Sequence, residues 1–84
     1  MEEKVLSIVE LSEVLKISPF TLRTYLGNYR FSEFMTKARI GDRYKNCVTM
    51  SKPFAYKLSD YLEILGRHEA IANLEKYYEE MENG

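Results

Sequence analysis

The amino-acid sequence predicts a small, mainly helical domain that carries one β-hairpin and is followed by a C-terminal helix. Three observations support this fold class. Apolar residues recur at helical spacing near both ends of the chain, β-favouring residues gather around Gly41-Asp42, and the chain has only 84 residues. This length suits one domain, which we expect over residues 1–66, with the additional helix over residues 67–84.

The composition describes a folded chain without a metal or disulfide framework. It is 45% hydrophobic and 30% charged, with four Gly and two Pro, which is unlike a disordered sequence. Cys47 is the only cysteine and His68 the only histidine, and these two residues cannot supply the four ligands of a structural zinc site. We therefore expect no metal and no cofactor. Because the sequence has neither an apolar run of about 18 residues nor a signal peptide, we expect a cytoplasmic protein without membrane association.

Charge is strongly segregated along the chain, although the net charge is only -1. Residues 16–58 hold nine bases against two acids, whereas residues 1–15 and 59–84 are acidic. A local basic field attracts phosphate groups whatever the pI of the whole chain. The alternative is a solvated face whose bases pair with the acidic ends.

The first helix is predicted over residues 8–16. Ser7 is placed to cap it, and Glu10, three residues later, completes a capping box ahead of an apolar stripe. The sequence Ile17-Ser18-Pro19 then interrupts the stripe.

A second helix is predicted from Pro19 to Leu26 or Gly27. Ser18 is its expected N-cap, and Pro19 suits a first helical position, where the missing N–H is not needed. Gly27-Asn28 predicts a left-handed cap at its end. The apolar positions expected to face inward are Leu22, Tyr25 and Leu26.

Two short helices joined by a tight turn have the geometry of a helix-turn-helix, although many such pairs are only structural. If Leu22 and Leu26 are buried, Thr21, Arg23 and Thr24 point outward. Their hydroxyl and guanidinium groups suit phosphates and base edges. Phe20 is open to two interpretations, since it either packs against the first helix or contacts a thymine methyl group or a sugar.

The middle of the chain predicts a β-hairpin wing. Residues 35–41 and 46–51 favour strands, and residues 41–46 read as the connection between them. The alternative is that these residues are polar only because a hairpin tip is exposed. The side chains expected to reach a DNA backbone or minor groove are Lys37, Arg39, Arg43 and Lys45, with Tyr44 near the tip.

After the hairpin, Pro53 interrupts any continuous strand, so residues 54–58 are expected to form a third short strand or an extended link. Ser59 is then the expected cap of a third helix, which Gly66 ends.

The C-terminal helix begins near His68, which we interpret as a capping or surface residue rather than a ligand. Its apolar stripe needs a partner: either it folds back on the domain, or it pairs with its copy in a homodimer. The stripe residues, which we expect to mediate dimerisation, are Ile71, Leu74, Tyr78 and Met81.

The run from Leu6 to Leu26, LSIVELSEVLKISPFTLRTYL, resembles the helix-turn-helix of MerR-type regulators and of related excisionase-like winged helices. Residues 18–25, SPFTLRTY, are similar to the family's serine, threonine-leucine-arginine and aromatic signature, and residues 56–65 resemble the segment after the wing. Residues 30–54 form a longer stretch than the usual wing region, and no coiled coil or ligand domain follows. Effector sensing is therefore not expected.

The resemblance implies a winged helix-turn-helix that binds double-stranded DNA. It makes Thr21, Arg23 and Tyr25 the contacting residues of the recognition helix, and Arg39, Arg43 and Lys45 those of the wing. A small transcriptional regulator or excisionase-like factor of a phage, plasmid or mobile element fits this resemblance, and we expect it at the nucleoid.

The alternative function is a protein-interaction adaptor that keeps the winged-helix scaffold. An enzyme is not expected, because the sequence lacks a Gly-rich phosphate loop, and Cys47 and His68 lie too far apart to imply a nucleophilic pair. Cys47 is interpreted as a buried apolar residue rather than a thiol sensor.

Overall fold

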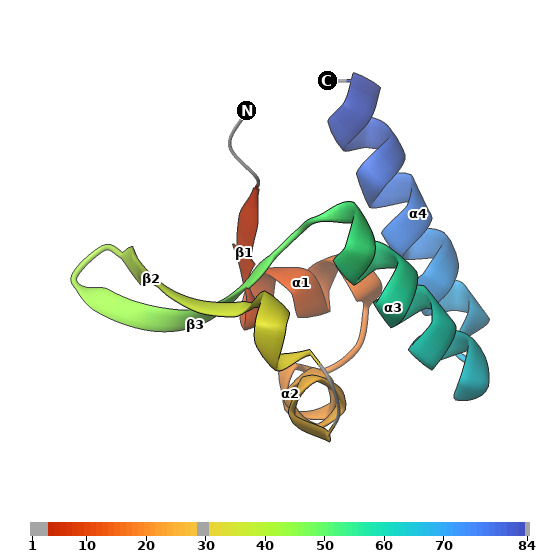
Figure 1. Ribbon diagram of the computed structural model, residues 1–84, viewed down its shortest axis with the longest axis horizontal. Coiled ribbons are helices and arrows are strands. Elements are labelled where there is room, and N and C mark those ends of the chain that lie inside the picture. The colour runs from red at the N-terminus through yellow and green to blue at the C-terminus, as the bar shows by residue number, and fades with distance from the viewer. Residues whose placement is uncertain (1–3, 29–30, 84) are drawn as a thin grey trace.

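A computed structural model describes residues 4–28 and 31–83 as four α-helices, one short 3-10 helix and a three-stranded sheet. In Figure 1 the β2–β3 hairpin projects from one end of the molecule, and α3 and α4 lie side by side at the other end. The elements in chain order are β1 Val5–Ser7, α1 Ile8–Leu15, α2 Pro19–Asn28, η1 Ser32–Phe34, β2 Met35–Ile40, β3 Arg43–Thr49, α3 Lys52–Ile64 and α4 His68–Asn83.

The sheet is antiparallel with strand order β1-β3-β2. The predicted hairpin is confirmed, but its connection is the two residues Gly41-Asp42 rather than residues 41–46. Gly41 has a φ of 67°, which glycine adopts without steric cost, and a leading glycine is typical of two-residue hairpin turns. Arg43 and Lys45 therefore belong to a strand instead of a loop.

The third strand is β1, where Leu6 pairs with Val48, and it is not formed by residues 54–58. Those residues lie in α3, so the prediction of a strand or an extended link there was wrong. Ser51 is the N-cap, and its Oγ accepts a hydrogen bond from the Phe54 N–H at 3.4 Å. Pro53 fits because an N–H in the first turn of a helix has no partner within the helix. Ser59 consequently lies inside the helix rather than at its cap.

The predicted ends of the helices are confirmed in part. The capping box of Ser7 and Glu10 is present, and Gly66, with a φ of 74°, follows α3 as expected. The left-handed residue in the first half of the chain is Lys16, the C-cap of α1, with a φ of 59°. Gly27 has no positive φ, because α2 continues through it to Asn28. Arg30, which we counted in the basic segment, lies outside the described residues.

The core lies between the sheet and the helices. Phe54 of α3 contacts Phe31 and Phe34 edge-on, with ring centroids 5.9 and 5.4 Å apart. Buried side chains come from every helix except the 3-10 turn and from the inner part of the sheet. Those that are fully buried include Leu11, Leu15, Leu22, Val48, Phe54, Leu58, Leu62 and Leu74.

The C-terminal helix folds back on its own chain, which is one of the two arrangements considered for it. Leu74 is 1% exposed and belongs to the common core. The Asn73 side chain donates to the Leu15 carbonyl at 3.4 Å, and the Tyr78 hydroxyl donates to the Ser51 carbonyl at 3.3 Å. Helix α4 is thus an integral part of the folded body.

Candidate functional site

A groove of about 310 Å³ lies where β1, α1, α2 and β3 meet. We call it the basic groove, because a guanidinium from α2 and two cationic side chains from β3 line it. It is formed by Ser7, Ile8, Val9, Arg23, Arg43, Tyr44, Lys45 and Asn46.

Because α1 begins directly after the short strand β1, the edge of β3 beside this groove has no neighbouring strand among the described residues. Strand β1 ends at Ser7, which pairs with Cys47, and the capping box turns the chain into α1 at the next residue. In the described part of the chain no strand therefore covers this edge of β3 over residues 43–46. The uncovered edge forms one wall of the basic groove, and residues 7–9 form another.

Helix α2 brings Arg23 to the groove. Ser18 caps the helix by accepting the Thr21 N–H at 3.1 Å, while its own hydroxyl donates to Thr21 Oγ1 at 2.8 Å. Leu22 and Leu26 are buried, which orients the helix so that Arg23 is exposed, as expected.

Among the other predicted contact residues of α2, Phe20 and Thr24 are exposed. Phe20 is 79% exposed and so does not pack into the core beside α1. The Thr24 hydroxyl donates to the Phe20 carbonyl at 3.1 Å. Both side chains lie on the outer surface of α2, outside the lining of the basic groove.

Tyr25 lies away from the groove and holds α2 against the rest of the helical body. Its ring is half-buried and meets Tyr61 edge-on at 5.6 Å. Its hydroxyl accepts a hydrogen bond from Arg67 Nε at 3.1 Å, and the Arg67 guanidinium also lies 5.8 Å from the ring centroid. This matches the inward orientation expected from helical spacing and leaves little of Tyr25 to contact DNA.

The hairpin divides its four predicted bases between two faces. Residues paired across an antiparallel ladder share a face, and successive residues alternate. Arg43 and Lys45 therefore share one face, whereas Lys37 and Arg39 share the other with Tyr44, the partner of Arg39. The Arg39 Nε donates to the Gly41 carbonyl at 3.3 Å. Arg43 and Lys45 line the basic groove, and Lys37 and Arg39 do not.

The bases of the groove carry uncompensated charge. Over residues 4–28 and 31–83 the ion pairs are Lys52–Glu82 and Lys57–Glu33, and both lie elsewhere. Arg23, Arg43 and Lys45 thus make no ion pair with a described residue. Over residues 4–28 and 31–83, the structure therefore gives no support to the alternative in which the acidic ends neutralise these three side chains.

The remaining residues that the sequence analysis singled out lie outside the basic groove. Leu74 is in the core, whereas Ile71, Tyr78 and Met81 are half-buried, and the use of this stripe as a dimer interface stays a prediction. Cys47 is buried beside the Lys45 carbonyl, to which its Sγ donates at 3.4 Å, as expected of a small core residue. His68 is exposed at the start of α4.

Four lining residues of the groove were missed by sequence reasoning: Ser7, Ile8, Val9 and Asn46. The capping box gave the start of α1, but only the pairing of β1 with β3 brings that start beside residues 43–46. None of the described helices is long and apolar enough to span a membrane. Nor do the described residues include a group of three or more His, Cys, Asp or Glu side chains that could hold a metal ion.

Comparisons of the chain with protein-family models, with curated proteins and with solved structures give no significant match.

Proposed function

We propose that this chain is a double-stranded DNA-binding protein with a winged helix-turn-helix architecture, in which α2 is the recognition helix and the β2–β3 hairpin is the wing. One observation carries the proposal. Arg23 of α2 and Arg43 and Lys45 of the hairpin line the same groove, and none of them has an acidic partner among the described residues. The function that fits best is a small transcriptional regulator or an excisionase-like architectural factor.

The chemistry of the groove suits a duplex. A guanidinium donates two hydrogen bonds to a phosphate or to a guanine edge, and a lysine neutralises a phosphate as a point charge. Phe20, exposed in the first turn of α2, is available for a sugar or a thymine methyl group. In this arrangement the wing bases set the register on the backbone, while Arg23 and its neighbours on α2 face the major groove.

The exposed hydroxyl groups near the start of α2 support the same orientation. Ser18 and Thr21 already form a local hydrogen-bonded pair at the helix N-terminus. Helix N-termini attract phosphates through their unpaired N–H groups and the helix dipole. The docking of this end of α2 on a phosphate would bring Arg23, one turn further along, toward the base edges.

The test is a titration of the purified chain against a fluorescent mixed-sequence duplex at several salt concentrations. Each phosphate contact changes the slope of log K against log salt by about 0.9, so the wild type should lose affinity steeply as salt rises. The double variant Arg23→Ala/Arg43→Ala should bind at least about ten-fold more weakly at low salt. Its slope should be shallower by about one, because Arg43 contacts the backbone whereas Arg23 faces the base edges.

The matched control is Lys52→Ala/Lys76→Ala, which also removes two positive charges but on α3 and α4. At about 0.15 M salt, where the Debye length is about 8 Å, it should change the affinity by no more than about two-fold, because distant charges are screened. A wild-type chain that fails to bind at low salt, or equal losses in the two variants, would contradict the proposal. The adaptor alternative predicts the first of these results.

A further inference from the structure

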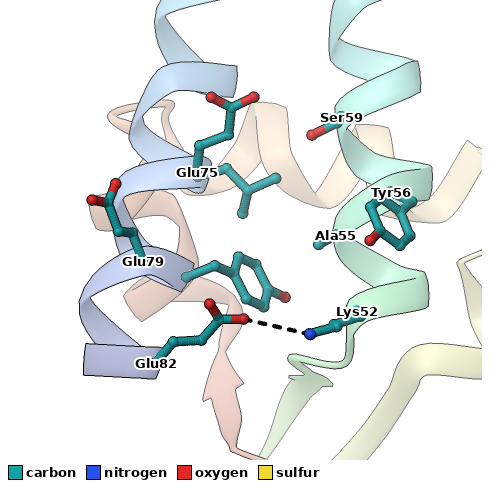
Figure 2. A pocket seen from close by; sticks show the side chains of 9 residues that line it. Lys52, Ala55, Tyr56, Ser59, Glu75, Glu79 and Glu82 are labelled. Carbon is teal, nitrogen blue, oxygen red and sulfur yellow. Dashed lines mark ion pairs between the residues drawn. The ribbon is translucent and has the colours of Figure 1, made fainter. Parts of the chain in front are cut away.

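A second groove, of about 430 Å³, lies between α3 and α4. We call it the acidic groove, because α4 contributes three carboxylates to it. Figure 2 shows Glu75, Glu79 and Glu82 on the α4 side and Lys52, Ala55, Tyr56 and Ser59 on the α3 side. Leu74 and Tyr78 complete the lining.

The acidic groove combines an apolar surface with unpaired negative charge. Ala55, the half-buried ring of Tyr78 and the largely exposed Tyr56 provide the apolar part. Glu82 forms an ion pair with Lys52 at 3.6 Å, but Glu75 and Glu79 form none with a described residue. A segment with an exposed aromatic ring next to two cations would complement this surface.

The outer face of the hairpin has this composition. Tyr44 is 73% exposed, and it shares a face with Lys37 and Arg39. Lys37 and Arg39 lie outside the lining of the basic groove, whereas Tyr44 borders it. A cavity of roughly 150 Å³ accommodates a benzene ring, so the acidic groove of about 430 Å³ has room for the ring of Tyr44.

The charge spacings also match. Glu75 and Glu79 are four residues apart on one helix face, which separates them by about 6 Å along the α4 axis. Lys37 and Arg39 are two residues apart on one strand, which separates them by about 6.7 Å. Each cation can therefore face one carboxylate when the strand lies along the helix.

The hairpin cannot reach the acidic groove of its own chain, because the two lie at opposite ends of the longest axis of the molecule (Figure 1), which measures 37 Å. We propose that the hairpin face of Lys37, Arg39 and Tyr44 docks into the acidic groove of a second copy of this chain. The hairpin face and the acidic groove are different surfaces, so the contact between two copies is head-to-tail. Each pair leaves one hairpin face and one acidic groove free, and further copies can therefore add to form an open chain of molecules.

This proposal goes beyond DNA binding and is tested without DNA. A single hairpin in a groove belongs to the class of interfaces below roughly 1,200 Å², which are weak, so association is expected only at the upper end of the concentration series. Sedimentation velocity over a concentration series should show a weight-average sedimentation coefficient that rises with concentration at low salt. At about 1 M salt, where the Debye length is about 3 Å, the rise should be largely suppressed.

Two variants each remove one surface. The hairpin variant is Lys37→Gln/Arg39→Gln/Tyr44→Thr, and the groove variant is Tyr56→Ser/Glu75→Gln/Glu79→Gln. All six positions are exposed, so both variants should fold, which a melting curve checks. Each variant alone should stay monomeric. In an equimolar mixture, the intact hairpin of the groove variant should dock into the intact groove of the hairpin variant. This one-to-one complex should grow no further, because it has no other intact hairpin face or groove.

The proposal is overturned if the wild type stays monomeric throughout the series, or if both variants associate as well as the wild type does. The second result would point to another surface, such as a symmetric pairing of α4. A mixture that fails to form the one-to-one complex would also overturn it. None of these outcomes depends on whether the basic groove binds DNA.

Discussion

The helical body and the outer half of the hairpin divide two tasks between them. The helical body holds most of the fully buried side chains, including Phe54, Leu62 and Leu74, and contacts between its helices hold it together. In the hairpin, residues 41–46 are exposed and carry Arg43 and Lys45. Stability therefore resides in one region and the candidate recognition charge in the other. Substitutions in the outer hairpin are therefore expected to leave folding unchanged while they test the proposed binding, whereas substitutions in the body are expected to change folding as well.

The strongest test of this division compares two aromatic truncations. Phe54→Ala removes a ring that is fully buried between Phe31 and Phe34, and it should lower the free energy of unfolding by about 3–5 kcal/mol. Tyr44→Ala removes an aromatic ring that is 73% exposed and should change that free energy by less than about 0.5 kcal/mol. Urea unfolding followed by circular dichroism measures both. Similar losses in the two variants would show that the hairpin contributes to stability as much as the body does.

A second comparison concerns α4, and it uses two aliphatic truncations. Leu74→Ala opens a cavity in the core and should cost about 2–5 kcal/mol, whereas Ile64→Ala, at a side chain that is 82% exposed, should cost less than about 0.5 kcal/mol. Unfolding is measured at micromolar concentration. If α4 were stabilised by pairing with a second copy instead of packing on α1 and α3, the cost of Leu74→Ala would fall toward that of Ile64→Ala on dilution.

The parts of the fold that the sequence predicts well are those with local physical causes. The capping box of Ser7 and Glu10, the cap at Ser18 and the stop at Gly66 each depend on residues within one helical turn. The exposure of Arg23 follows from the burial of Leu22 and Leu26 on the opposite face of α2. The exposed position of Arg23, which we propose as a recognition residue, and the helices around it could therefore be predicted from periodicity alone.

The parts that were missed depend on contacts between distant segments. Strand β1 has three residues and forms a strand because it pairs with residues 47–49, some 40 positions away. At the start of α3, Pro53 was read as a strand breaker, although Ser51 and Pro53 together are also a helix-start signal. Thus the helices of the site were predictable, whereas the groove that joins Arg23 to Arg43 and Lys45 required the three-dimensional pairing.

The smallest expected change in the free energy of unfolding is at the contact between α4 and the start of α3. The half-buried Tyr78 donates its hydroxyl to the carbonyl of Ser51, the N-cap of α3, at 3.3 Å. Tyr78→Phe removes this hydrogen bond but keeps the ring, so it should cost about 0.5–1.5 kcal/mol at neutral pH. The exposed hairpin offers the matched control, because Tyr44→Phe removes a hydroxyl that has no recorded partner among the described residues.

The same hydroxyl should make the body, and not the hairpin, sensitive to alkali. Burial raises the pKa of Tyr78 well above the ordinary tyrosine value of 10.0, and the adjacent Tyr77 phenol adds to this increase. The folded chain therefore keeps a proton that the unfolded chain releases, so the stabilisation is fully present below about pH 10 and is lost as pH rises beyond it. Unfolding free energies between pH 8 and pH 11 should fall less steeply above about pH 10 in Tyr78→Phe than in the wild type. Tyr44→Phe should follow the wild-type curve, and parallel curves for all three proteins would mean that Tyr78 is not held in its neutral form by the contact between α4 and α3.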